Sequence, residues 1–138
     1  MNSLFGKMLP LFGGFRRVED FFTEIVVRLF ELRPDICLGW LEEVGAISNR
    51  EDGEVRRTIQ IHPQKPFGRD RIDIFMEVIS TSRSGDAEPF IEIIAIESKL
   101  GAREGEGQLP KYATHLKEMS GNRKTLLYVT RNYDPKWV

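Results

Sequence analysis

The chain has few of the residues on which several classes of protein depend. It contains one cysteine, Cys37, among 138 residues, so it can form neither an internal disulfide nor a thiolate metal cluster. With only two histidines and no cysteine spacing typical of zinc ligands, a zinc site is not expected. We therefore expect a cytoplasmic protein that is stabilised by an apolar core rather than by cross-links.

Long apolar runs are absent as well. No run reaches the length of about 18 uncharged apolar residues that a membrane-spanning helix needs, so no membrane partner is expected. Residues 1–15 are mildly apolar but are interrupted by Lys7, Pro10, Gly13 and Gly14, and we interpret them as an N-terminal arm rather than a signal peptide. Residues 1–138 fit a single domain, which could also be part of a longer protein.

The chain also lacks an excess of charge of one sign, with a formal net charge of −1. Proteins that bind duplex nucleic acid often carry a positive excess, so this balance counts mildly against such a partner. Basic residues do gather in local clusters, at Arg16-Arg17, Arg56-Arg57, 69–71 and Arg123-Lys124. Each cluster could contact phosphates, and each could equally be solvated surface charge.

Helical periodicity is clearest between Val18 and Leu32. Apolar side chains there recur three or four positions apart, which predicts a helix with a broad buried face. Pro34 is expected to end this helix. A short second helix is predicted over 36–44, and Asp52-Gly53 is a turn signal.

Three strand-like segments follow, and we predict strands over 57–62, 72–79 and 90–98. The first alternates apolar and polar residues and is followed by Pro63. The third is almost continuously apolar before Glu97, which predicts a central strand covered on both faces.

A further helix is predicted from about residue 107 to Gly121. Pro110 is tolerated in it only within the first turn, and a glycine is typical of a helix end. A strand over 124–130 comes next. The order of helix, three strands, helix and strand predicts an α/β fold, with the last helix connecting the third strand to the fourth.

Three charged residues lie at strand ends in this arrangement. Asp73 is early in the second strand, and Glu97 and Lys99 end the third. Because strand side chains alternate, Glu97 and Lys99 point to one face, and pairing of the two strands would bring Asp73 beside Glu97. Neighbouring carboxylates repel each other unless a cation neutralises them, and Mg²⁺ prefers such oxygen ligands. A cation held there could activate water for attack on a phosphodiester.

The same spacing has a simpler explanation. Lys99 could form an ion pair with Glu97 or Asp73 at the edge of the sheet, without any catalytic role. Charges at the end of a buried strand are costly unless they are paired or used, and both explanations meet that requirement. Spacing alone leaves the two open.

Longer motifs resemble those of one nuclease superfamily. They are Arg71-Ile72-Asp73-Ile74, Ile96-Glu97-Ser98-Lys99-Leu100 and Gly107-Gln108-Leu109-Pro110-Lys111-Tyr112. Together they resemble the PD-(D/E)XK nucleases, more closely the bacterial and phage-related members, over roughly residues 18–130. The resemblance implies a restriction-endonuclease-like αβββαβ core with a central mixed sheet flanked by helices. The proline that gives the family its name is replaced by Ile72.

The resemblance also implies a role for each matching residue. Asp73 and Glu97 would bind Mg²⁺ or Mn²⁺, helped by the backbone carbonyl of Ser98. Lys99 would be the catalytic lysine. Gln108 would orient the attacking water or contact the substrate backbone.

Glu24, on the first helix, matches an acidic residue that some members use as an extra metal ligand. A solvated helix face is an equal alternative for it. The implied function is metal-dependent hydrolysis of nucleic acid, DNA rather than RNA, and the implied assembly is a homodimer. Two other functions stay open: a non-catalytic module of the same fold for nucleic-acid binding or protein assembly, and a hydrolase of small phosphate esters.

Overall fold

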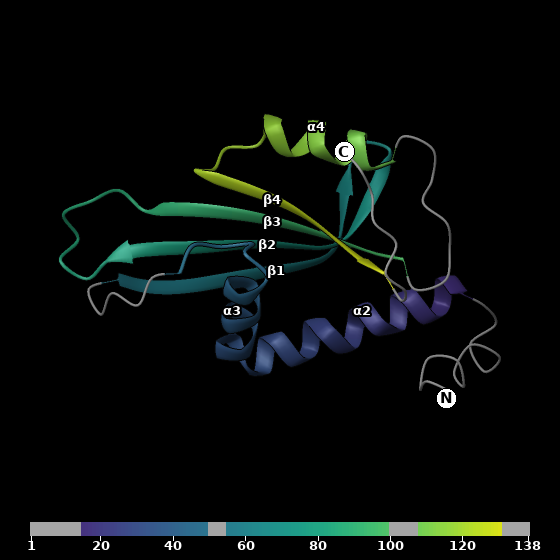
Figure 1. Ribbon diagram of the computed structural model, residues 1–138, viewed down its shortest axis with the longest axis horizontal. Coiled ribbons are helices and arrows are strands. Elements are labelled where there is room, and N and C mark those ends of the chain that lie inside the picture. Colours follow the sequence, from purple (N-terminus) through teal and green to yellow (C-terminus); the bar gives the residue numbers. More distant parts are fainter. Residues whose placement is uncertain (1–14, 50–54, 100–107, 131–138) are drawn as a thin grey trace.

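A four-stranded mixed sheet lies at the centre of the protein, with helices on both of its faces (Figure 1). The computed structural model describes residues 15–49, 55–99 and 108–130. The strands, in their order across the sheet, are β1 (Val55–Phe67), β2 (Asp70–Ser82), β3 (Phe90–Lys99) and β4 (Arg123–Thr130). The helices are α2 (Phe15–Leu32), α3 (Pro34–Glu43) and α4 (Gln108–Glu118). The predicted α/β class is confirmed.

The strand pairing follows the predicted order of elements. β1 pairs antiparallel with β2, β2 pairs antiparallel with β3, and β3 pairs parallel with β4, so α4 makes the connection between the parallel pair. β3 lies between two strands, and its residues 92–98 are all buried, which confirms a central strand covered on both faces. The predicted arm and the Asp52-Gly53 turn lie outside the described residues, apart from Phe15, which begins α2.

Two strands are longer than predicted: β2 extends from Asp70 to Ser82 rather than over 72–79, and β1 differs more. β1 does not end at His62 but continues through Pro63 and Pro66 to Phe67. β1 is an edge strand, with β2 as its single neighbour in the sheet, so the amide that each proline lacks is not required by a second neighbouring strand. Pro34 behaves as predicted, since α2 ends at Leu32 and the proline begins α3.

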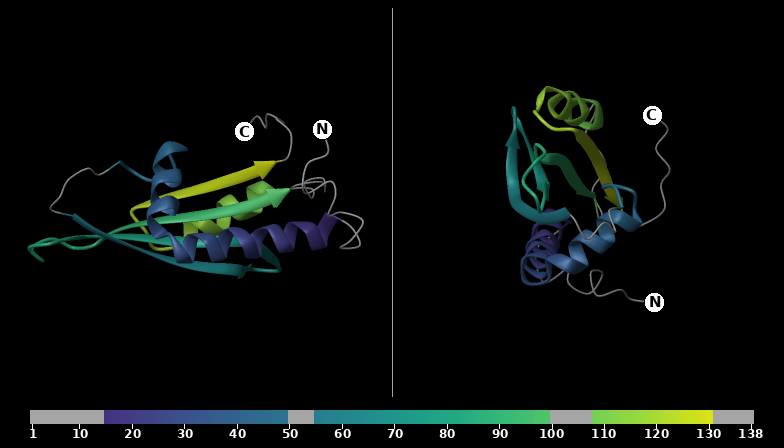
Figure 2. Two further views of the ribbon diagram at one scale, coloured as in Figure 1. Left: turned by 90° about the horizontal axis from the view of Figure 1, so that it is seen from below. Right: turned by 90° about the vertical axis from the view of Figure 1, so that its left-hand side faces the viewer.

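The apolar residues form two cores, one on each face of the sheet. Ile74, Met76 and Ile94 pack against α2 and α3, in a cluster that includes Phe30 and Leu41. Phe75, Ile93 and Ala95 pack under α4, in a cluster that includes Tyr112 and Leu116. The two views in Figure 2 show the resulting three layers from other sides. None of the described helices is long and apolar enough to cross a membrane.

The β1–β2 hairpin bends towards α4 near its end (Figure 1). The pairing of the two strands skips Gln64 and Asp73, and Gln64 has a positive φ of 57°. Beyond this point Phe67 and Ile72 both join the cluster under α4, although Ile74 faces α2. The register is the same on both sides of this gap, so no residue is inserted, and the irregularity lies in the backbone at Gln64 and Asp73. Asp73 lies at this irregularity.

A buried carboxylate ties four segments together on the α3 side of the sheet. Glu92 of β3 accepts a hydrogen bond from the Ser48 amide at 2.9 Å and lies within 3.9–4.0 Å of the guanidinium groups of Arg57 and Arg123. Arg57 also pairs with Glu42 of α3. Glu92 is fully buried, so its charge is tolerated only because these donors surround it.

Removal of this carboxylate is expected to destabilise the fold strongly. In Glu92→Ala the Ser48 amide loses its acceptor and Arg57 and Arg123 lose their shared partner, and leaving buried donors without an acceptor in this way costs about 1–3 kcal/mol. Urea unfolding followed by circular dichroism measures the loss. Glu88→Ala, at an exposed loop position, should change the free energy of unfolding by no more than about 0.5 kcal/mol. Equal unfolding midpoints for the two variants would contradict the buried ion cluster.

The thiol of Cys37 is expected to be inert in the folded protein. Burial disfavours the thiolate and raises the pKa of the Cys37 thiol to about 12. At pH 8 a disulfide reagent such as Ellman's reagent should therefore react only as the protein unfolds, and at once in guanidinium. Rapid, stoichiometric labelling of the native protein would show that this side chain is not in the core.

Candidate active site

The site centres on a hydrogen bond between the side chain of Asp73 and the backbone of β3. The Ser98 amide donates to Asp73 Oδ2 at 2.8 Å. The β2–β3 pairing begins at Ile74, opposite Ile96, so Asp73 sits where the strand ladder stops. There the carboxylate of Asp73, rather than a backbone carbonyl of β2, accepts the hydrogen bond from the Ser98 amide.

Glu97 directly precedes Ser98 in the chain, so the Ser98 nitrogen that donates to Asp73 belongs to the peptide bond between the two residues. Continuing the antiparallel register by one step beyond Ile74 and Ile96 puts Asp73 and Glu97 at opposite positions. The side chain of Glu97 is only 3% exposed. The structure therefore brings the Asp73 side chain to the end of β3, at the residue that follows Glu97.

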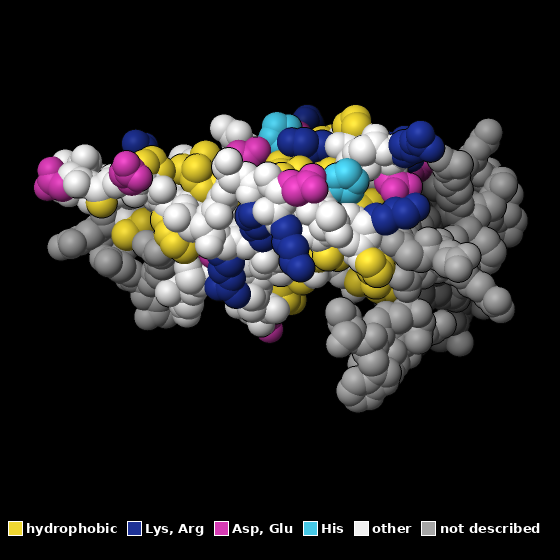
Figure 3. Space-filling view, turned by 90° about the horizontal axis from the view of Figure 1, so that it is seen from above, with side chains coloured by type: hydrophobic (Ala, Val, Ile, Leu, Met, Phe, Trp, Pro, Cys, Tyr) yellow, Lys and Arg dark blue, Asp and Glu magenta, His cyan; other side chains and the backbone are white. Residues whose placement is uncertain are grey.

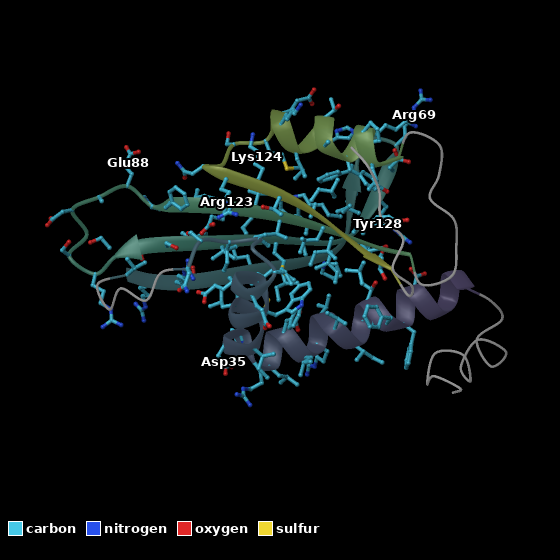
Figure 4. All side chains as sticks on the ribbon, in the orientation of Figure 1. Asp35, Arg69, Glu88, Arg123, Lys124 and Tyr128 are labelled. Atoms are coloured by element: carbon cyan, nitrogen blue, oxygen red, sulfur yellow. The ribbon has the colours of Figure 1, made fainter. Side chains whose placement is uncertain are left out.

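Alternation along β3 divides its last residues between the two faces of the sheet. Ser98 lines a cavity on the α2 and α3 side, together with Ile74, Ile96 and Val129. Ile93 and Ala95 pack under α4, so Glu97 lies on the α4 side by the same alternation. On β4, the position that pairs with Glu97 is Tyr128, which Figure 4 labels.

Two predicted site residues are described by their backbone alone. Lys99 ends β3, where it pairs with Thr130 of β4. Gln108 is the first residue of α4. The side chains of both lie outside the described residues, so their roles stay predictions.

The start of α4 is attached to β2 close to Asp73. The hydroxyl group of Tyr112 donates to the backbone carbonyl of Arg71 at 3.2 Å, and the Tyr112 ring is buried against Phe67. Tyr112 is therefore a core residue, as expected from its place on the apolar stripe. Its bond to Arg71 holds the helix that begins at Gln108 near the strand that carries Asp73.

Glu24 is placed differently from the other predicted ligands. It is exposed on α2, a helix that packs on the opposite side of the sheet from α4. The acidic residue of α2 that does contact the strand of Asp73 is Asp20, whose carboxylate lies 3.6 Å from the guanidinium of Arg71. Both of these side chains are about half exposed, so this ion pair is weak.

The basic clusters noted in the sequence differ in what they can do. Arg57 and Arg123 contact Glu92, and Lys124 donates to the Lys117 carbonyl at 2.8 Å. Arg69 is exposed and lies in the turn beyond Phe67 that packs against α4 (Figure 4). On the α4 side, basic, acidic and histidine side chains are interspersed among the described residues (Figure 3).

The donor set suits a hard cation with retained waters. Asp73, Glu97 and the Ser98 carbonyl offer oxygen atoms, and a carboxylate that accepts one hydrogen bond keeps further lone pairs. Within 15–49, 55–99 and 108–130, no group of three or more His, Cys, Asp and Glu side chains is placed to hold a metal ion. Mg²⁺ is commonly bound by one or two carboxylates with water and substrate phosphate completing its shell, which is the arrangement these residues fit.

Comparisons with protein-family models, curated proteins and solved structures found no match. The function is therefore argued from the geometry of this chain.

Sequence reasoning missed three features that position the site. The bend at Gln64 and Asp73 had no clear signal beyond the prolines of β1, and the Tyr112–Arg71 bond joins residues 41 positions apart. The Asp73–Ser98 bond was likewise not anticipated, although strand pairing correctly brought Asp73 to the end of β3.

Loss of the Asp73 acceptor should loosen the end of β3 alone. A hydrogen bond to a charged acceptor contributes about 1.5–3 kcal/mol, so in Asp73→Ala the Ser98 amide should exchange with deuterium roughly ten- to a hundredfold faster. Exchange is measured residue by residue by NMR. The amide of Ile94, inside the sheet, serves as the internal reference.

Asp73→Asn is the matched control, because its amide oxygen can still accept from Ser98. Its Ser98 amide should stay more protected than in Asp73→Ala. Unchanged protection of Ser98 in Asp73→Ala would mean that the bond does not hold the strand end.

Proposed function

We propose that this protein is a Mg²⁺- or Mn²⁺-dependent nuclease of the PD-(D/E)XK type that hydrolyses phosphodiester bonds of DNA. The observation that carries the proposal is the 2.8 Å hydrogen bond from the Ser98 amide to Asp73, which fixes one carboxylate beside the residue that bears the other, Glu97. A nuclease needs two such oxygen donors at fixed separation to hold a cation against a phosphate.

The order of elements supports the same proposal. The chain runs α2, α3, β1, β2, β3, α4, β4, which contains the αβββαβ order implied by the sequence motifs, with α3 as one additional helix. The three motif segments also meet in space, because Asp73 bonds to Ser98 and Tyr112 bonds to Arg71. Chance motifs scattered over 42 residues, from Arg71 to Tyr112, have no reason to converge in this way.

In the proposed site, Asp73, Glu97 and the Ser98 carbonyl hold the cation. When bound, the cation supplies a water of lowered pKa and stabilises the charge that develops on the phosphate. Burial of Glu97 keeps its carboxylate away from bulk water, which strengthens its attraction for a cation. The hydrogen bond to Ser98 keeps Asp73 from swinging away from it.

Lys99 and Gln108 complete the proposed machinery. Lys99 shares the face of Glu97 by strand alternation, and its ammonium group is assigned to the attacking water or the scissile phosphate. Gln108 begins the helix that Tyr112 ties to β2, and its amide is assigned to orienting the water. Glu24 is left out of the proposed ligand set, because it is exposed on a helix of the opposite layer.

A non-catalytic module of the same fold is the second candidate. The interspersed charges on the α4 side favour it, because a surface that binds the phosphate backbone of nucleic acid is usually more uniformly basic (Figure 3). It predicts that the acidic residues matter for stability alone.

The decisive assay measures cleavage of plasmid, linear single-stranded DNA and RNA by the purified chain with Mg²⁺, Mn²⁺ or EDTA. Cleavage should require the metal and be greatest on DNA. Glu97→Gln and Lys99→Ala should each lower the rate about a hundredfold or more with the fold retained. The control is Glu88→Gln, which changes an exposed glutamate of the β2–β3 loop and should cleave at the normal rate.

Calorimetry with Mn²⁺ separates the two roles. Glu97→Gln should lose metal binding, whereas Lys99→Ala should keep it and lose only cleavage. A wild-type protein that binds no Mn²⁺ and leaves all three nucleic acids intact would refute the nuclease and favour the non-catalytic module.

A further inference from the structure

Helix α2 is apolar on a second side that the sheet does not cover. One side is buried in the core through Thr23, Val27 and Phe30. On the outer side, four large apolar side chains are between 36% and 64% exposed, and they form the outer stripe: Phe21, Ile25, Leu29 and Leu32. Their spacing of four, four and three positions puts them on one face of the helix. In Figure 1 α2 lies along the lower side of the molecule, on the other side of the sheet from α4.

The two borders of the outer stripe differ in character. On one border lie Glu24, Arg28 and Glu31, all exposed, with Arg28 3.5 Å from Glu31. On the other border, Phe22 and Val26 line an apolar cavity of about 300 Å³. Apolar surface therefore continues past the stripe on one side and ends in charges of both signs on the other.

We propose that the outer stripe is the contact between two copies of this chain, with the two α2 helices packed antiparallel about a two-fold axis. With Ile36 of α3, which is also exposed, the stripe offers roughly 400–500 Å² per copy, so two copies would bury about 800–1,000 Å² from these side chains alone. Specific interfaces begin near about 1,000 Å², and the cavity border adds apolar surface to this figure.

The borders select the antiparallel arrangement. A two-fold axis across the helices sets like borders against each other, so that the charged border of one copy meets the charged border of the other. A parallel pair would instead set Arg28 and its acidic neighbours against the apolar cavity border, where their charges would lose solvent.

The antiparallel register also pairs opposite charges. If Ile25 of one copy lies opposite Leu29 of the other, the two Arg28 side chains approach each other across the two-fold axis, and each also lies beside Glu24 of the other copy. Arg28 then has an acidic residue on each side, Glu31 in its own helix and Glu24 across the contact. Charges at the rim of a contact fix register more than they add affinity.

The first test is the oligomeric state of the whole chain by sedimentation equilibrium. The wild type should be a dimer in the micromolar range, and Leu29→Glu should raise its dissociation constant about a hundredfold or more. Val44→Glu is a matched control, since Val44 and Leu29 are both 46% exposed and Val44 lies outside the stripe. It should dimerise like the wild type, and circular dichroism should report the same fold for all three proteins.

The second test fixes the orientation by cross-linking. Cys37 is the only cysteine and is fully buried, so a new surface cysteine is the only accessible thiol. Arg28→Cys should be joined to a second copy in high yield by a short bismaleimide, because the two positions lie near the axis. Val44→Cys should stay uncross-linked.

Three results would overturn the proposal. One is a wild type that remains monomeric up to several hundred micromolar. Another is a dimer whose dissociation constant Leu29→Glu does not change. The third is a monomer that dimerises only after residues 1–14 are removed, which would assign the stripe to the chain's own N-terminal segment. None of these measurements depends on nuclease activity.

Discussion

The bend of β2 at Asp73 is the constraint on which the candidate site depends. Before Asp73, β2 pairs with β1 alone, in the part of the hairpin that lies near α4. From Ile74 onwards β2 pairs with β3 as well. At the bend a side chain replaces the backbone as the acceptor for Ser98. A carboxylate that serves as part of a strand ladder has little freedom to rotate, so Asp73 is fixed at the end of β3, and in the proposed site it is positioned before the cation binds. Such preorganisation is what electrostatic catalysis requires.

Two buried glutamates on β3 illustrate how the same residue type serves two purposes. Glu92 lies on the α3 side, where the Ser48 amide and two guanidinium groups surround it. Glu97 lies five residues later, on the opposite face and at the strand end beside Asp73. The first carboxylate joins α3, β1, β3 and β4 into one body. In the proposed function the second binds the cation, and the rigidity that Glu92 gives to β3 helps to hold it in position.

Local patterns predicted most of the fold, and contacts between distant residues account for what they missed. The apolar run of β3 and the periodicity of α2 identified a central strand and a packed helix, because burial acts on consecutive residues. The predicted end of β1 at His62 was wrong, because a strand tolerates a proline such as Pro63 only at the edge of a sheet, and the local sequence does not show which strand is at the edge. The partners of Glu92 lie 31 to 44 positions away, and no local signal connects them. The approach of Asp73 to the end of β3 was predictable because it follows from strand pairing.

A crystal of the protein grown with Mn²⁺ and measured by anomalous diffraction tests the central claim most directly. Convergence of Asp73 and Glu97 on one cation predicts a single strong peak about 2.1 Å from an oxygen of each carboxylate and near the Ser98 carbonyl. The Ser98 amide should still donate to Asp73 in that crystal. Absence of a peak there, with the Asp73–Ser98 bond intact, would show that the bond only completes the sheet and that the site binds no cation.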